Sequence, residues 1–373
     1  GDLERFPVEL PNAAMRTALA FAPRLCRFLS PRSTGPKRAV TVWASQEKFF
    51  NRSQSEVTNP RGHGRLLTKR QDWKELSGRS LELNSTTALI TRLTQKRQFQ
   101  EGLQVYRNAE EKDQVLCCAA LNLCAKALLT DEARAIWASL PHEWKDVVGY
   151  NCMLDLCKRT KQLRAASAYL DEMRREGVEP NLITYTTMIG TYSMTGRPDE
   201  AVSMFDSIQD LLSEATAETQ TITYLSVMTA TARSGDYSRT RKLFMQMVES
   251  GLQPNHLHFN VLLMSCASKG KKLPDIAKSI FDSMPAWGLQ PRAEDFCILL
   301  SCCNEDLPRA KEVFDDLLRA GHQPTTMIYV ELLEAHVLAK DRAGAERIIA
   351  DLEESGYQGR KLSFMKEQLY AAA

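Results

Sequence analysis

Apolar residues recur at helical spacing along most of the chain and fall into paired segments. In 147–181 they occur on both sides of a polar break near Thr160 and Lys161, which is the pattern of two amphipathic helices joined by a turn. The second segment carries a small residue followed four positions later by a bulky one, as in Ala166 and Leu170. Residues four apart share one face of a helix, so this register predicts a helical hairpin with a closely packed interior.

The hairpin pattern repeats along the chain. Aromatic residues near the start of each first helix are separated by 33 to 39 residues, at Tyr150, Tyr185, Tyr224, Phe259, Phe296 and Tyr329. Several hairpins end in a Gly-x-x-Pro sequence, such as 177–180. Glycine adopts the left-handed conformation that stops a helix, and proline cannot continue one. A period near 35 residues predicts an α-solenoid, in which each hairpin buries its apolar face against its neighbours.

The Tyr-Asn pair at 150–151, the Ala and Met at 166 and 173, and the Gly-x-x-Pro-Asn ending at 177–181 resemble the pentatricopeptide repeat. The resemblance implies an all-α fold, an α-solenoid wound as a right-handed superhelix of about eight helix-turn-helix repeats. We expect the repeats at 83–113, 114–146, 147–181, 182–220, 221–255, 256–292, 293–325 and 326–360, with a closing helix at 361–373. The tetratricopeptide repeat is the structural alternative, but only its Ala-x-x-x-Phe second helix is present.

The amino-terminal segment has a different composition. Between Ala13 and Gln46 there is no acidic residue, whereas basic residues are spread among Ala, Leu, Phe and Ser. This is typical of a transit peptide, which we place at 1–46, for a chloroplast or a mitochondrion, with Met15 as a candidate start. The alternative is a basic arm that contacts nucleic acid. Residues 47–82 are polar, contain turn formers and are interpreted as a linker.

The resemblance implies that the first helices line a concave surface that holds single-stranded RNA. It assigns base sandwiching to the second position of each repeat, here Val148, Ile183, Ile222 and Leu257. It assigns base reading to the fifth and last positions, here Asn151, Asn181, Thr186, Asn255 and Asn260. The amide pair Asn151 and Asn181 can both donate and accept hydrogen bonds and is expected to favour a pyrimidine. Candidate phosphate contacts are Lys158, Arg159, Arg241 and Lys242.

The charge balance favours a second function class. Residues 83–373 carry 33 Lys and Arg against 38 Asp and Glu, a net charge of −5, whereas proteins that depend on phosphate contacts usually show a basic face. The fifth positions after residue 290, Cys297 and Val330, also lack polar reading groups. The alternative is therefore a protein scaffold in an organellar ribosome or RNA-processing complex, which binds partners through the concave surface or the irregular segment around 205–220.

Signatures of catalysis are absent from the sequence. There is no Gly-rich phosphate loop, no HExxH, no GxSxG and no cytidine-deaminase element with His-x-Glu and Cys-x-x-Cys. The side chains of His256 and His258 are two residues apart and point in different directions on a helix, and the ten cysteines fall in helical patterns typical of reduced core thiols. We therefore expect a non-enzymatic protein of the pure-repeat type, without catalytic or metal-binding residues, cofactor or membrane partner. Its expected partners are organellar mRNA, whose processing, stability, editing or translation it affects, and other RNA-processing or ribosomal proteins.

Overall fold

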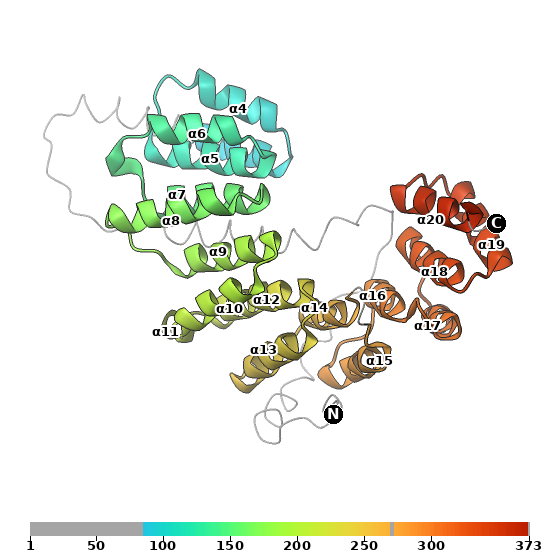
Figure 1. The fold of residues 1–373 in the computed structure, drawn as a ribbon. Helices are drawn as coiled ribbons and strands as arrows, with labels where there is room; N and C mark the ends of the chain where they lie inside the picture. The colour runs from blue at the N-terminus through green and yellow to red at the C-terminus, as the bar shows by residue number, and fades with distance from the viewer. Residues whose placement is uncertain (1–84, 269–271, 372–373) are drawn as a thin grey trace, which may run out of the picture. The chain divides into compact units, whose positions relative to one another are not determined.

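A computed structural model describes residues 85–268 and 272–371, so the expected leader at 1–46 and linker at 47–82 lie outside the described residues. Every regular element in the described ranges is a helix (Figure 1), which confirms the all-α prediction. The chain divides into two compact units, with the boundary between Glu214 and Ala215. We call them the amino-terminal and the carboxy-terminal unit and describe each by itself.

The amino-terminal unit is a stack of helical hairpins. A helix over 85–95 is followed by α4 (Phe99–Asn108), α5 (Gln114–Ala127), α6 (Thr130–Ser139), the 3-10 turn η2 (His142–Trp144), α7 (Val147–Arg159), α8 (Leu163–Arg175), α9 (Leu182–Thr195), α10 (Pro198–Ser207) and the short α11 (Gln209–Ser213). Within the hairpins α5 packs on α6, α7 on α8 and α9 on α10. Between hairpins α5 packs on α7 and α7 on α9. The first helices therefore form one layer and the second helices another.

The carboxy-terminal unit repeats this arrangement. It contains α12 (Ala217–Arg233), α13 (Tyr237–Glu249), α14 (His256–Cys266), α15 (Pro274–Ser283), the 3-10 turn η3 (Met284–Trp287), α16 (Ala293–Cys303), α17 (Leu307–Arg319), α18 (Thr326–Leu338), α19 (Arg342–Glu354) and α20 (Arg360–Ala371). The first helices α12, α14, α16, α18 and α20 each pack on the next in order. Thus α20 takes the place of one more first helix in the layer.

Helix α12 begins earlier than expected, because the sequence predicts that its repeat starts at residue 221. It begins at Ala217 because Thr216 caps it, with the Thr216 side chain accepting a hydrogen bond from the backbone N–H of Thr219 at 3.4 Å. An N-cap hydroxyl satisfies one of the backbone donors that a helix start leaves open. The extra residues lengthen the helix at its amino end, and Tyr224 keeps its buried place in the register.

The small residues of the second helices lie at the bottom of the hairpin interface, as the register predicts. All six alanines of the register are fully buried, namely Ala133, Ala166, Ala201, Ala277, Ala310 and Ala345. In α13 the place is taken by Thr240, which is also fully buried. Its hydroxyl lies 2.9 Å from that of Thr231 on α12, so a hydrogen bond between the two helices replaces the close contact of an alanine.

Aromatic pairs join four of the second helices to the next first helix, namely α6 to α7, α13 to α14, α15 to α16 and α17 to α18. The ring centroids of Trp137 and Tyr150 are 4.8 Å apart in the amino-terminal unit. In the carboxy-terminal unit the pair Phe281 and Phe296 has a separation of 4.7 Å. Edge-to-face pairs of this kind add to the free energy gained by burying the rings. The aromatic residues that reveal the period in the sequence are thus the contacts that hold consecutive hairpins together.

The cysteines belong to this core. All nine cysteines in the described ranges are free thiols, and seven of them are buried, which confirms the interpretation as core residues. Burial raises the pKa of the Cys124 thiol to about 12, so its reactive thiolate is disfavoured. None of the helices between residues 85 and 371 that the structure describes combines the length and the apolar character that a membrane span needs.

Candidate nucleic-acid interface

The predicted reading pair Asn151 and Asn181 comes together where α7 meets α9. Asn151 Nδ2 donates to Asn181 Oδ1 at 3.4 Å, and Thr184 Oγ1 donates to Asn151 Oδ1 at 2.8 Å. Asn151 is only 4% exposed, whereas Asn181 is half-buried. The fifth position of one repeat, its last position and the third position of the next repeat therefore form one polar cluster.

Asn181 has a structural role besides the predicted one. It is the N-cap of α9, and its Oδ1 accepts a hydrogen bond from the backbone N–H of Thr184 at 3.0 Å, while its own N–H donates to Thr184 Oγ1 at 3.2 Å. This reciprocal arrangement is a capping box. Because the cap occupies the amide oxygen, the amide nitrogen of Asn181 is the group left to donate to a ligand.

A second polar cluster lies where α14 meets α16. The carboxylate of Asp295, the third residue of α16, is fully buried. It accepts from the backbone N–H of Arg292 at 2.7 Å and lies 3.2 Å from His256 Nδ1. The Asn260 amide is satisfied when its nitrogen faces this carboxylate, where Nδ2 donates to Asp295 Oδ1 at 2.5 Å and to the His256 carbonyl at 3.3 Å. The predicted reader Asn260 is thus held by a residue of the next repeat.

The contact of α12 with α14 has a different chemistry. Asn255 caps α14 by accepting from the backbone N–H of Leu257 at 2.9 Å, and its Oδ1 lies 2.8 Å from His258 Nδ1. His258 is fully buried, and burial lowers the pKa of its imidazole to about 4. The fifth position of the preceding repeat is Leu225, which is buried and apolar. In repeat 221–255 the last-position residue Asn255 is therefore not paired with a polar fifth-position side chain that could contact a base.

The four predicted sandwiching residues share one environment. Each is half-buried in the first turns of a first helix, with part of its apolar side chain open to solvent, namely Val148, Ile183, Ile222 and Leu257.

Thr186, the remaining predicted base-reading residue, is half-buried on α9. The last residue of its expected repeat, Gln220, lies inside α12 and donates from Nε2 to the Ala215 carbonyl at 3.1 Å.

Lys158 and Arg159 at the end of α7 both pair with Asp155. Lys158 Nζ lies 2.5 Å from Asp155 Oδ1, and Arg159 Nε lies 2.6 Å from Oδ2. Burial alone raises the pKa of the Asp155 carboxyl, but the charges of Lys158 and Arg159 and their hydrogen bonds outweigh it and lower the pKa to about 2. Two cations and one anion leave the cluster with one net positive charge.

The other predicted phosphate contacts lie elsewhere. Arg241 and Lys242 belong to α13, a second helix, and Lys242 is exposed while Arg241 is half-buried. The structure does not bring them to the first-helix layer that carries the reading positions. Around Lys158 and Arg159, by contrast, the ends of α5, α7 and α9 enclose a surface hollow of about 210 Å³, which Lys126, Leu128 and Met194 also line.

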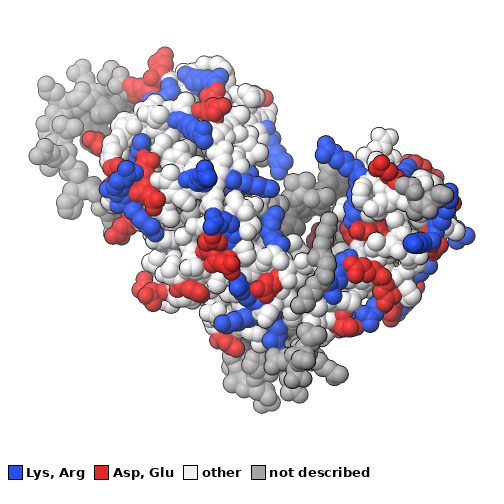
Figure 2. Space-filling view, in the orientation of Figure 1, with Lys and Arg blue, Asp and Glu red and all other residues white. Residues whose placement is uncertain are grey.

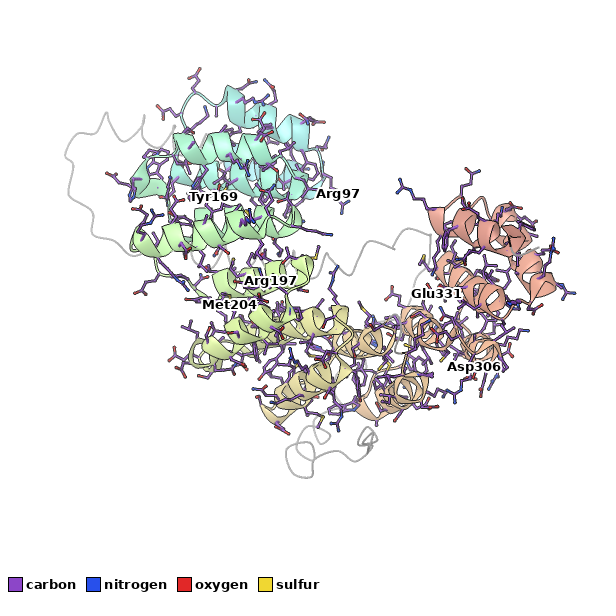
Figure 3. The ribbon with its side chains drawn as sticks, in the orientation of Figure 1. Arg97, Tyr169, Arg197, Met204, Asp306 and Glu331 are labelled. Atoms are coloured by element: carbon purple, nitrogen blue, oxygen red, sulfur yellow. The ribbon has the colours of Figure 1, made fainter. Side chains whose placement is uncertain are left out.

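Sequence reasoning missed a basic edge at the turns inside the hairpins of the amino-terminal unit. The turns themselves carry Lys96, Arg97, Lys161 and Arg197 and no acidic residue, and the first helices end beside them in Lys126, Lys158 and Arg159. The second helices begin there with acidic residues, at Glu101, Asp131, Glu132, Asp199 and Glu200. Basic side chains lie along the right-hand side of this unit in Figure 2, where Figure 3 labels Arg97. Within the described part of the chain Arg97 and Lys161 make no ion pair. The signal was present in the sequence, as a recurrence of cations between paired helices.

The segments that join one hairpin to the next carry the opposite charge in this unit. Between residues 109 and 214 they contain Glu110, Glu111, Asp113, Glu143, Asp146, Glu176, Glu179, Asp210 and Glu214, against Lys112 and Lys145. Within the amino-terminal unit the turns inside the hairpins are therefore basic and the segments between hairpins are acidic. The bulk charge of −5 over 83–373 conceals this separation.

Family models match three adjoining stretches of the chain. The PPR repeat family matches residues 145–194, a PPR repeat matches 183–211, and the pentatricopeptide repeat domain matches 212–269. The chain is a pentatricopeptide-repeat protein. The resemblance of 147–181 is thereby confirmed, and the tetratricopeptide alternative falls away.

Curated relatives of this pentatricopeptide-repeat protein come from Arabidopsis thaliana. The small ribosomal subunit protein mL103 is 25% identical over 177 residues, which cover 46% of this chain and 41% of that protein. A repeat-containing protein named as mitochondrial is 24% identical over the same shares, and one named as chloroplastic is 29% identical over 110 residues, 30% of this chain and 14% of that protein. The chain spans about two fifths of the length of the first two relatives.

Solved structures of pentatricopeptide-repeat proteins are also similar. One is PPR10 in complex with an 18-nt psaJ RNA element, with 18% identity over 89% of this chain and 55% of that chain and a TM-score of 0.42. Another is the PPR domain of Arabidopsis thaliana protein-only RNase P 1 in complex with tRNA, with 20% identity over 58% of this chain and 95% of that chain and a TM-score of 0.33.

Proposed function

We propose that this pentatricopeptide-repeat protein binds single-stranded organellar RNA along the first-helix layers of its units and thereby affects the processing, stability, editing or translation of a transcript. The observation that carries the proposal is the contact of Asn151 with Asn181 at 3.4 Å, at positions that come from separate helices and are 30 residues apart. Half-exposed Val148 and Ile183 stand beside this pair. Amide groups that can bind a base edge and apolar side chains that can contact its faces thus come from the same two helix starts.

The chemistry of this cluster fits a base edge rather than a phosphate. The amide nitrogens of Asn151 and Asn181 are donors without charge, and N3 and O2 of a cytosine or O2 and O4 of a uracil are acceptors. Val148 and Ile183 begin successive first helices and offer apolar surface to the two faces of the same base. Stacking of this kind contributes ~1–3 kcal/mol per base. We therefore propose a pyrimidine as the ligand of repeat 147–181.

The basic edge of the amino-terminal unit supports a path for the RNA backbone. Lys126, Lys158 and Arg159 line one hollow, and Lys161, Arg164 and Arg197 contribute to a second of about 550 Å³. Cations that follow a groove attract the phosphates of a single strand independently of its sequence. We propose that phosphate contacts concentrate here rather than at Arg241 and Lys242.

The division into repeats and the location follow the sequence interpretation. Helices begin at residues 114, 147, 182, 256, 293 and 326, which supports the eight proposed repeats from 83–113 to 326–360. Relatives named as mitochondrial and as chloroplastic support an organellar location, as does the proposed leader at 1–46. We propose that the protein is located in an organelle, either a chloroplast or a mitochondrion.

A scaffold function is the second candidate, because one relative is named as a ribosomal subunit protein. Leu225 and Val330 occupy fifth positions in the carboxy-terminal unit and are buried. Repeats with such positions offer no polar group to a base. They support a model in which this unit binds protein within a ribosome or an RNA-processing complex.

A polarisation titration of the full chain separates the two candidates. The probes are fluorescein-labelled pyrimidine-rich and purine-rich single-stranded RNAs at ~0.15 M salt, where phosphate binding is not exaggerated. The double variant Asn151→Ala/Asn181→Ala is expected to bind the pyrimidine-rich probe about tenfold more weakly, a loss of ~1.4 kcal/mol. Asn181→Asp is the sharper variant, because aspartate caps a helix as well as asparagine does but presents an acceptor where asparagine presents a donor.

The matched control is Asn108→Ala, which removes an exposed amide at the end of α4 and should leave both affinities unchanged. Circular dichroism confirms that each variant keeps its helices. Absence of binding to either RNA by the folded wild-type chain contradicts RNA recognition and favours the scaffold.

A further inference from the structure

Three first helices carry a fully buried polar residue at their third position. These residues are Thr184 in α9, His258 in α14 and Asp295 in α16. Each belongs to one repeat but contacts the last residue of the repeat before it. Nothing in the pattern of reading positions assigns them a role.

Helix capping explains this placement. The last residue of each preceding repeat is the N-cap of the next first helix, and its backbone N–H donates to the third residue of that helix. The distances are 3.2 Å from Asn181 N to Thr184 Oγ1, 3.2 Å from Asn255 N to His258 Nδ1 and 2.7 Å from Arg292 N to Asp295 Oδ2. Because consecutive first helices pack side by side, Thr184 and Asp295 also contact the fifth-position residue of the preceding repeat, Asn151 and Asn260 respectively.

Thr184 and Asp295 hold the asparagine at that fifth position in opposite orientations. The hydroxyl of Thr184 donates to Asn151 Oδ1 at 2.8 Å, so the Asn151 oxygen faces inward and its nitrogen faces Asn181. A carboxylate only accepts, so Asp295 binds the nitrogen of Asn260, at 2.5 Å. The Asn260 oxygen is therefore turned away from the buried cluster.

We propose that the third residue of the following repeat is a positioning residue, which sets whether the fifth-position amide presents an N–H donor or a carbonyl acceptor to the RNA base. The inference rests on the proposed RNA-binding function. Repeat 147–181, with Thr184 beneath it, presents donors from Asn151 and Asn181. Repeat 256–292, with Asp295 beneath it, presents the acceptor Oδ1 of Asn260.

The two orientations select different bases. At the central ring nitrogen of the Watson–Crick edge, cytosine and adenine carry an acceptor, whereas uracil and guanine carry an N–H donor. The donors of repeat 147–181 match the first pair, which together with the proposed preference for a pyrimidine selects cytosine. The acceptor of repeat 256–292 matches the second pair. His258 has no amide to orient, because Leu225 occupies the fifth position before it, so repeat 221–255 takes no part in this selection.

Replacing Asp295 by the residue found in the other cluster tests the inference. The full chain and its Asp295→Thr variant each select ligands from a random 14-nucleotide single-stranded RNA pool, and the bound fractions are sequenced. Threonine can accept from Arg292 N and donate to Asn260 Oδ1, as Thr184 does in its own cluster. The ratio of uracil and guanine to cytosine and adenine is expected to fall about fivefold or more at one motif position and to stay constant at the others.

Two further variants keep the test decisive. Asp295→Asn preserves the shape of the side chain but is no longer an obligate acceptor, so it should relax the preference at the same position without inverting it. In an Asn260→Ala background, Asp295→Thr should have no effect on the ratio. Thermal melting shows whether each variant is folded, and Asp295→Asn is the variant to use where threonine prevents folding.

Each outcome points to one conclusion. Failure of the folded wild-type chain to enrich any motif contradicts the proposed RNA binding itself. An enriched motif that Asp295→Thr and Asp295→Asn both leave unchanged overturns the positioning role while RNA binding stands. A change that persists in the Asn260→Ala background also overturns it, because the effect then does not pass through the amide.

Discussion

The amino-terminal and carboxy-terminal units are built from the same hairpin but differ in charge at equivalent places. The turns inside the hairpins carry only cations in the first unit, including Arg97 and Arg197, whereas Glu305 and Asp306 occupy such a turn in the second (Figure 3). The linkers between hairpins are acidic in the first unit. In the second unit the four stretches 250–255, 288–292, 320–325 and 355–359 contain no Asp or Glu.

The units also differ at the fifth positions of their repeats. Asn151 in the first unit meets a second amide, while Leu225 and Val330 in the second are buried apolar residues. Asn260 is the polar exception in the second unit, and it is held by a carboxylate. The comparison teaches that one packing scheme tolerates different residues at the fifth position, an amide pair in the first unit and buried apolar side chains in the second.

The largest expected effect concerns what the units share. Trp137→Ala and Phe281→Ala each remove a buried ring from an interface between hairpins and should each destabilise their own unit by ~3–5 kcal/mol. Hydrogen exchange read at α7 and at α16 measures the two effects separately. Met327→Ala, at a side chain that is 50% exposed, is the control. Equal loss of protection in both units from either variant alone would break the comparison, since the units would then unfold as one.

A smaller effect is specific to the carboxy-terminal unit. Burial lowers the pKa of His258 from 6.5 to about 4. A histidine whose pKa is lower in the folded chain than in the unfolded chain stabilises fully above the unfolded pKa, and this stability is lost as the pH falls from about 6.5 towards 4, by up to roughly 3 kcal/mol. His258→Thr, which copies Thr184, should reduce the difference between unfolding midpoints at pH 7.5 and pH 4.5. An unchanged difference in this variant rules out His258 as its source.

The smallest expected effect comes from reversing the charges at the turns inside the hairpins, where the two units differ. Arg97→Glu/Lys161→Glu should weaken RNA binding about tenfold and reduce the slope of log affinity against log salt by about 1.4, because each phosphate contact on a single strand contributes about 0.7. The reciprocal change Glu305→Lys, at a side chain that is 62% exposed, should strengthen binding about twofold. Titrations at several salt concentrations measure both slopes. A gain from Glu305→Lys as large as the loss from Arg97→Glu/Lys161→Glu would contradict the proposal that phosphate contacts concentrate at the amino-terminal edge.

Much of the fold could be predicted because the repeat places the same demand on each hairpin. The buried alanines such as Ala166 and the aromatic residues such as Tyr150 were identified from spacing alone, since a helix surface has a fixed period. The early start of α12 was not predicted. It depends on Thr216 acting as a cap, and several residues between 208 and 221 are equally suited to begin a helix.

The candidate site could be predicted only in part. Asn151 and Asn181 were named from their positions, and the structure brings them into contact. The pairing of Lys158 and Arg159 with Asp155 and the contact of Asp295 with Asn260 were not foreseen. Ion pairs and buried hydrogen bonds depend on side-chain direction and on partners from other helices, neither of which a helical period specifies.

The sequence by itself determined the period, the hairpins and the residues that pack them, because burial of an apolar stripe repeats with every turn of a helix. Only the tertiary structure decided which polar groups meet between repeats. Asn260 and Asp295 are 35 residues apart in sequence, and their contact exists because a helix cap and the packing of two first helices bring both to one buried place. The Asp295 carboxylate there and the Thr184 hydroxyl at the equivalent place beside Asn151 orient their amides in opposite ways, since a carboxylate can only accept a hydrogen bond and a hydroxyl can also donate one.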